Sequence, residues 1–301
     1  MAEAALKRDG FGSTAKDEVR RVLDRVKAEG RDSLTAPEGK LVCDAYGIPV
    51  PKEGVASSAS DATRLADSMG YPVVLKIVSP DILHKTEAGG VLVGLKSADE
   101  VAKGYETILA NAKNYKADAK IDGVQIQQML KGGTEVIVGA ITDGSFGKLV
   151  AFGLGGVLVE VLKDITFRLA PATHDDALSM LDGIQANEML KGVRGGDAVS
   201  REALASVIVK VSQLVSDFPE ISELDLNPVF ATKDDAIAAD VRIVVDWNAK
   251  PREAVRSNEE IVTAMNRIMR PKAVAVIGAS AEAGKIGNSV MKNLINGGYK
   301  G

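Results

Sequence analysis

Two side chains that could act on a phosphate group lie in one stretch, residues 71–93. Lys76 sits inside an apolar, β-branched run at 72–78, which predicts a buried strand. A buried ammonium needs an anionic partner, because taking an unpaired charge out of water is costly. His84 follows in a polar loop after a Ser-Pro turn signal, and a neutral imidazole is a competent nucleophile toward phosphoryl groups. The stretch therefore indicates a phosphate-binding lysine and a histidine that can carry a phosphoryl group.

Both residues also have a purely structural interpretation. Lysines at strand ends commonly extend their ammonium groups to water, so Lys76 alone is weak evidence. From spacing alone, His84 is better explained as a solvated histidine on a surface loop. A functional interpretation of either residue requires further polar groups near it.

A second polar group alternates with leucines in the segment ELDLNP. Strand alternation would put Glu223, Asp225 and Asn227 on one face, and Asp240 is expected on the neighbouring strand. Carboxylate and amide oxygens suit Mg²⁺, which keeps waters and takes further ligands from substrate phosphates. The alternative is an exposed polar strand face.

Two further features leave function and structure open. Glu135, in strand context and facing away from Val136, could accept hydrogen bonds from a ribose or purine, or could be a solvated edge charge. The glycine cluster at 153–156 could let backbone approach a ligand, or could make a tight strand connection. His174 lies at a helix start and is given no role.

Composition excludes several classes of protein. The chain has 301 residues, a net charge of −4 and 46% hydrophobic residues, which is typical of a soluble protein with two domains or one bilobal domain. It has no basic stripe, which argues against nucleic acid as a partner. The single cysteine, Cys43, excludes an internal disulfide, and two histidines exclude a multi-histidine metal site. Without a membrane-length apolar run or a signal-peptide core, we expect a cytoplasmic protein with no membrane contact.

Periodicity predicts the elements that must position these residues. Helices are expected at residues 17–29, 37–46, 61–69, 98–115, 175–181 and 200–216. Strands are expected at 48–55, 72–78, 91–95, 123–130, 134–142, 148–152, 157–162, 165–169, 223–230 and 236–245. Thr35 and Glu38 form a capping box for the second helix. This irregular order indicates an α+β fold rather than a regular βαβ alternation.

The composition changes near Asn248. A charged, helix-like linker is expected at 250–270, followed by a strand at 273–277, a glycine-rich turn and a helix at 288–295. That order opens a nucleotide-binding Rossmann unit. Since one βα unit cannot bury its own faces, we expect residues 271–301 to begin a second, truncated domain.

Together these motifs resemble the ATP-grasp subunit or domain of NDP-forming acyl-CoA synthetases, which are the ADP-forming acetate–CoA ligases related to succinyl-CoA synthetase. The resemblance spans about residues 33–301 and is carried by these segments: PVVLKIVSPDILHKTEAGGV, GGTEVIVGAI, FGLGGVLVEVLKDITFRLAP, LKGVRGG, ELDLNP, AADVRI and PKAVAVIGASAEAGKIGNSVMKNLINGGYKG. It implies an N-terminal arm and helix (1–32), a two-lobed α+β ATP-grasp domain (33–249), a linker (250–270) and the start of a Rossmann-like CoA-binding domain (271–301).

The resemblance also implies a reaction and residue roles. A carboxylic acid, CoA and ATP would give acyl-CoA, ADP and phosphate through an acyl phosphate and phosphohistidine. The implied roles are nucleotide contact by Lys76, Glu135, Gln127 and Met129, phosphoryl transfer by His84, phosphate contact by Arg168, Mg²⁺ binding by Asn227 and Asp240 with Asp225 beside them, and CoA-phosphate contact by Gly278, Ala279, Ser280, Lys285 and Gly287.

The family's other phosphohistidine and its acyl pocket belong to domains that this sequence lacks. The remaining CoA-binding and ligase domains are therefore expected in the same chain or in a second subunit, within an oligomer. The ATP-grasp part precedes the CoA-binding part, an order that only some members have. Two other functions stay open: an ATP-grasp ligase joining a carboxylate to an amine, and a nucleotide-sensing module without turnover.

Overall fold

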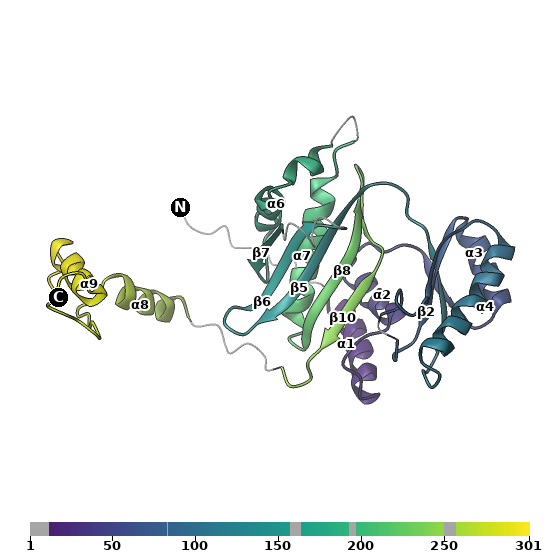
Figure 1. Cartoon of the computed structure of the whole chain (residues 1–301), viewed down its shortest axis with the longest axis horizontal. Coiled ribbons are helices and arrows are strands. Elements are labelled where there is room, and N and C mark those ends of the chain that lie inside the picture. The colour runs from purple at the N-terminus through teal and green to yellow at the C-terminus, as the bar shows by residue number, and fades with distance from the viewer. Residues whose placement is uncertain (1–11, 83, 157–163, 193–196, 250–256) are drawn as a thin grey trace. The chain divides into compact units, whose positions relative to one another are not determined.

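Lys76 lies on a four-stranded antiparallel sheet. The computed structural model describes residues 12–82, 84–156, 164–192, 197–249 and 257–301. The strands of this sheet are, in spatial order, β1 (Glu53–Ala56), β4 (Gly123–Gln128), β2 (Val73–Val78) and β3 (Val91–Leu95). Helices α3 (Ala59–Met69) and α4 (Ala98–Tyr115) cover one face, where Leu75 and Ile77 are fully buried (Figure 1). Lys76 points to the other face because strand side chains alternate. We call this part the small lobe.

A larger antiparallel sheet carries the ELDLNP segment. Its strands run β10 (Val241–Val245), β8 (Ile221–Ala231), β5 (Thr134–Asp143), β6 (Gly147–Leu154) and β7 (Ile165–Leu169), and β9 (Ala236–Ala238) pairs with β8. Helices α6 (His174–Gly183) and α7 (Arg201–Asp217) pack on one face (Figure 1). On β8, Leu224 and Leu226 are buried beneath these helices, and Asn227 is exposed on the open face. We call this part the large lobe.

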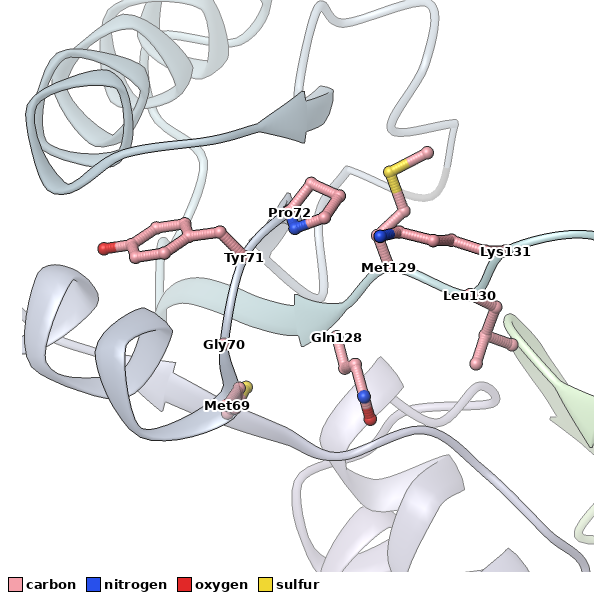
Figure 2. A pocket seen from close by; sticks show the side chains of 8 residues that line it. All are labelled: Met69, Gly70, Tyr71, Pro72, Gln128, Met129, Leu130 and Lys131. Carbon is pink, nitrogen blue, oxygen red and sulfur yellow. The ribbon is translucent and has the colours of Figure 1, made fainter.

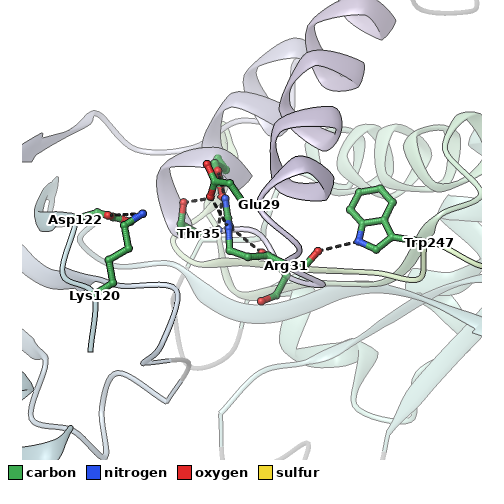
Figure 3. A network of polar contacts seen from close by, with 8 residues as sticks. Glu29, Arg31, Thr35, Lys120, Asp122 and Trp247 are labelled. Atoms are coloured by element: carbon green, nitrogen blue, oxygen red, sulfur yellow. Dashed lines mark hydrogen bonds and ion pairs between the residues drawn. The ribbon is translucent and has the colours of Figure 1, made fainter. Parts of the chain in front are cut away.

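The first two helices complete the large lobe. Helix α1 (Ser13–Ala28) buries an apolar stripe in its core, and α2 (Ala36–Ala45) begins at the predicted capping box. Between them, Arg31 donates two hydrogen bonds to the Glu38 carboxylate, at 2.6 and 2.9 Å. The indole of Trp247, just past the last strand, donates to the Arg31 carbonyl at 2.8 Å (Figure 3). The segment between the first two helices is therefore joined to the end of the lobe.

The predicted strand at 236–245 is interrupted in the structure. It forms β9 and β10, with Ala239 and Asp240 between them outside regular strand pairing. Because these two residues lie between the paired strands, the Ala239 carbonyl and the Asp240 carboxylate can bind groups outside the sheet. They lie beside Asn227 of β8. A short 3₁₀ helix, η1 (Asn187–Lys191), was not expected from periodicity, and the strand predicted at 157–162 falls outside the described residues.

The chain divides into two compact units, Met1–Pro251 and Arg252–Gly301. The second contains α8 (Asn258–Met269) and α9 (Ile286–Asn296). The predicted strand at 273–277 is wrong: within the described residues 257–301 no strand forms. An isolated strand has no neighbour to accept its backbone hydrogen bonds, which explains the difference. In the described ranges, no helix has the length and apolar composition needed to cross a bilayer.

Candidate functional site

Lys76 meets the large lobe at the break between β9 and β10. Its ammonium donates to the Asp240 carboxylate at 3.1 Å and to the Ala239 carbonyl at 2.9 Å. The lysine side chain is 11% exposed, whereas the Asp240 side chain is 42% exposed. The buried lysine thus has the anionic partner that its position requires, and that partner is still open to solvent.

A second ammonium approaches the same carboxylate. The Lys85 Nζ atom lies 4.0 Å from Asp240 Oδ1. Burial lowers the pKa of Lys85, the Asp240 carboxylate opposes that shift, and the Lys76 charge adds to it. Sequence reasoning does not single out Lys85, because a lysine in a polar loop is normally solvated; its one signal is its position directly after His84. Two ammonium groups thus meet at one solvent-open carboxylate, with the Glu53 carboxylate as a further anion nearby, and ammonium groups are charge-assisted donors to phosphate oxygens.

Two other residues expected at the Mg²⁺ site, Asn227 and Asp225, lie on β8 near Asp240. The Asn227 backbone N–H donates to the Asp240 carbonyl at 3.3 Å, and Asp225 lies two residues earlier on the same strand. Burial raises the pKa of Asp225, and the Glu223 and Asp240 carboxylates raise it further against the effect of Arg242. Crowded carboxylates of this kind are relieved by a cation. The set therefore fits Mg²⁺.

Within the residues that the structure describes, no three His, Cys, Asp or Glu side chains cluster closely enough to hold a metal by themselves. A cation at Asp240 and Asn227 would take its other ligands from water and from the substrate's phosphate oxygens. That is the usual coordination of Mg²⁺ in nucleotide sites.

His84 is exposed in a loop whose two ends are anchored. On one side, the Asp81 carboxylate accepts the Lys120 backbone N–H at 2.7 Å. On the other, the Asn111 side chain donates to the Gly89 carbonyl at 2.9 Å, and the Ile77 N–H donates to the Gly90 carbonyl at 2.8 Å. The imidazole is thus presented to solvent next to Lys85, on a loop attached to the strand that bears Lys76.

The two other predicted nucleotide contacts on the small lobe lie in different surroundings. Gln127, on β4, is buried and donates to the Glu53 carboxylate at 2.9 Å. Burial raises the pKa of Glu53, while Gln127 lowers it. Sequence reasoning does not identify Glu53. Met129 lines a hollow of about 310 Å³ at the end of β4, opposite Tyr71 and Pro72 (Figure 2).

Glu135 is exposed on the open face of the large lobe, beside the glycine cluster. The Gly155 N–H donates to the Glu135 carbonyl at 2.7 Å. A Cβ atom on Gly155 would lie 3.0 Å from the Glu135 carbonyl carbon, which is too close. Gly155 therefore allows the end of β6 to lie close to β5.

Arg168 is not brought to the Lys76 cluster. Arg168 is on the edge strand β7 and pairs with Val150 of β6, so its side chain lies on the helix-covered side of the sheet. Its guanidinium donates to the Ser179 hydroxyl of α6 at 2.9 Å. Asp225 and Asn227 lie on the opposite, open side. A contact between Arg168 and a phosphate would require the side chain to leave Ser179.

The second unit gathers the five residues predicted to contact CoA. Lys285 immediately precedes α9, and the Asn288 side chain donates to the Ser280 carbonyl at 3.0 Å. A Cβ atom on Gly287 would lie 1.9 Å from the Gly278 carbonyl oxygen, so only glycine fits there. Ala279 lies between Gly278 and Ser280, and the group forms a turn at a helix N-terminus.

Residues 25–245 match the family model described as "ATP-grasp domain". The chain is 49% identical over 227 residues to the beta subunit of an ADP-forming acetate–CoA ligase of Pyrococcus furiosus, covering 75% of this chain and 97% of that subunit. The chain belongs to the ATP-grasp family of ADP-forming acyl-CoA synthetases. This confirms the resemblance and the α+β ATP-grasp part of the predicted fold. The relatives are named as acid–thiol ligases.

Two other comparisons extend the family assignment. A single-chain ADP-forming acetate–CoA ligase of Archaeoglobus fulgidus is 38% identical, covering 81% of this chain and 35% of that protein. Two structures of an acetyl-CoA synthetase from Ca. Korarchaeum cryptofilum align with TM-scores of 0.68 and 0.67, each at 37% identity and covering 76% of this chain and all of that chain. The first holds coenzyme A and Mg-AMPPCP, with a phosphohistidine segment pointing towards its nucleotide-binding site.

Proposed function

We propose that this ATP-grasp chain binds ATP and transfers its terminal phosphoryl group within an ADP-forming acyl-CoA synthetase. The overall reaction would convert a carboxylic acid, CoA and ATP into acyl-CoA, ADP and phosphate. The observation that carries the proposal is the convergence of Lys76 and Lys85 on Asp240, beside a loop that exposes His84. The identity to acetate–CoA ligase beta subunits and the nucleotide complexes of the related structures support it.

In this proposal the chain's own groups bind and orient the phosphates. Lys76 and Lys85 would offset the charge of the phosphate oxygens, and Glu135, Gln127 and Met129 would contact the rest of the nucleotide. Asn227 and Asp240, with Asp225 beside them, would hold Mg²⁺, which would neutralise charge on the phosphates. Catalysis would then be mostly positioning and electrostatic stabilisation.

The covalent step would take place at His84. A ring nitrogen donates its lone pair to the terminal phosphorus of ATP while the bond from that phosphorus to the bridging oxygen breaks, and ADP leaves with the bonding electrons. The product is phosphohistidine. Arg168 could contact phosphate oxygens only after leaving Ser179, so its predicted role in this step is a separate proposal.

The later steps need groups outside this chain's ATP-grasp part. We propose that the acyl pocket and the second phosphohistidine come from further domains or a second subunit, in a cytoplasmic oligomer. The Gly278, Ala279, Ser280, Lys285 and Gly287 turn would contribute contacts to CoA phosphate. The naming of relatives as beta subunits supports such a partner.

The test is covalent labelling with ATP radiolabelled at the γ-phosphate. The chain has two histidines, so His174→Ala is a matched control for His84→Ala. We expect His84→Ala to abolish labelling while nucleotide affinity changes by no more than about twofold, and His174→Ala to label like the wild type. Undiminished labelling of His84→Ala would remove His84 from the mechanism. Nucleotide binding without any labelling of the wild type would favour a sensing module.

A further inference from the structure

The His84 loop contacts the large lobe through Lys85. The Lys85 backbone is held to the small lobe by two hydrogen bonds. The Gly90 N–H donates to the Lys85 carbonyl at 2.8 Å, and the Gly90 carbonyl accepts from the Ile77 N–H of β2. The Lys85 side chain runs the other way, is 18% exposed, and ends 4.0 Å from Asp240. Lys85 therefore connects the loop to the carboxylate expected to hold Mg²⁺.

This second ammonium is not needed to balance the charge of Asp240. Lys76 already donates to that carboxylate at 3.1 Å, and it is the more buried of the two lysines. Lys85 has the longer contact and lies on a loop rather than a strand. Of the two cations, Lys85 is the one that can leave Asp240 at small cost when another charge arrives.

Binding of Mg²⁺ and a nucleotide would bring a divalent cation and negatively charged phosphate oxygens close to Asp240. A divalent cation on Asp240 repels Lys85, and the phosphate oxygens that accompany it attract an ammonium. His84 is bonded directly to Lys85, and adjacent Cα atoms are about 3.8 Å apart, so a movement of one backbone carries the other.

We propose that Lys85 is a positioning residue that contacts Asp240 in the nucleotide-free chain and moves to the terminal phosphate when Mg²⁺ and nucleotide bind, bringing His84 to the phosphorus. The inference deepens the proposed function and rests on it. Lys85 thus competes with Mg²⁺ for Asp240 in the nucleotide-free chain and binds the terminal phosphate once the nucleotide is present.

The test compares Lys85→Met with Lys85→Arg, and uses Lys103→Met as a matched control. Lys103 is exposed on helix α4 of the same lobe, which covers the face of the sheet opposite Lys76. Two readouts are measured on the whole chain. Titration with Mn²⁺ alone, followed by electron paramagnetic resonance, reports competition at Asp240. The labelling rate of His84 at saturating γ-labelled ATP reports positioning.

We expect Lys85→Met to bind Mn²⁺ about two- to fivefold more tightly, because a competing cation is gone, and to label at least about tenfold more slowly. Lys85→Arg should label faster than Lys85→Met, and Lys103→Met should match the wild type in both readouts. A labelling rate of Lys85→Met within about twofold of the wild type, or unchanged Mn²⁺ affinity, would overturn the inference.

Failure of the proposed function gives a different pattern. In that case the wild-type chain would take up no label, although Mn²⁺ would still bind. The Mn²⁺ titration then tests the contact between Lys85 and Asp240 independently. Only the proposed movement of Lys85 to the phosphate would be refuted together with the proposed function.

Discussion

The Lys76 ammonium lies 3.1 Å from the Asp240 carboxylate, although 164 positions separate the two residues in the chain. One belongs to a strand of the small lobe and the other to a break in the sheet of the large lobe. The pair therefore joins the two lobes, and under the proposed function both lobes must be in register for the phosphates to be held.

Replacing Asp240 by asparagine tests the metal assignment. The amide keeps the shape but removes the charge that attracts the cation, so Mg²⁺-dependent nucleotide binding should weaken. We expect the Mg²⁺ concentration at the midpoint of AMPPCP binding to rise about tenfold, measured by calorimetry at fixed nucleotide.

Asp234→Asn is the matched control, because that aspartate lies in an exposed turn of the same lobe. Its midpoint should equal that of the wild type. Binding by Asp240→Asn that is unaltered at limiting Mg²⁺ would contradict the assignment of Asp240 as a ligand.

The Glu38–Arg31 pair should make stability depend on pH. Burial alone would raise the pKa of Glu38, but hydrogen bonds from Arg31 and Thr35 outweigh it and lower the pKa. Because the folded pKa is below the unfolded one, the pair stabilises the fold above the unfolded value of about 4.3, and this is lost as pH falls through the folded pKa. Glu38→Gln should reduce the free energy of unfolding at pH 7 by about 2–3 kcal/mol.

Urea denaturation at several pH values measures this difference. The gap between wild type and Glu38→Gln should shrink steadily below about pH 4. Glu29→Gln is the control, since Glu29 also binds Arg31 but is exposed, and its effect should stay below about 1 kcal/mol. A gap for Glu38→Gln that is constant with pH would show that charge is not its cause.

Gly155→Ala tests the close approach of β5 and β6. The new methyl group would press on the Glu135 backbone, where carbonyl carbon and oxygen both lie 3.0 Å away. We expect a loss of about 1–3 kcal/mol in stability, measured by thermal denaturation, and weaker nucleotide binding if Glu135 contacts the nucleotide.

Gly144→Ala provides the comparison, because a Cβ atom there meets nothing within 4 Å. It should leave stability within about 0.5 kcal/mol of the wild type. If Gly155→Ala were as stable as Gly144→Ala, the steric explanation of the glycine cluster would be wrong.

Capping motifs and hydrophobic periodicity predicted the helices and strands well where neighbouring residues determine the structure. The capping box at Thr35 and Glu38 forms, and the helix expected at 98–115 has those bounds in α4. Alternation on β8 placed Leu224 and Leu226 in the core. The strand at 273–277 failed because a strand depends on a partner that periodicity does not supply.

The site was harder to predict than the elements. Lys76 and Asp240 were expected to share a function, and only the folded chain shows them in contact. Lys85 and Glu53 carried no pattern of their own: a loop lysine and a lone glutamate at a strand start are ordinary surface residues. Their burial arises from long-range packing, which spacing in one sequence does not encode.

The hydrogen bond from Trp247 to Arg31 brings together the two ends of the stretch that matches the family model, residues 25–245. A module with neighbouring ends can be joined to other domains on either side, or made as a separate polypeptide, without rearranging its interior. That tolerance fits the relatives, since the part that matches this chain makes up 97% of the Pyrococcus furiosus beta subunit and 35% of the Archaeoglobus fulgidus ligase.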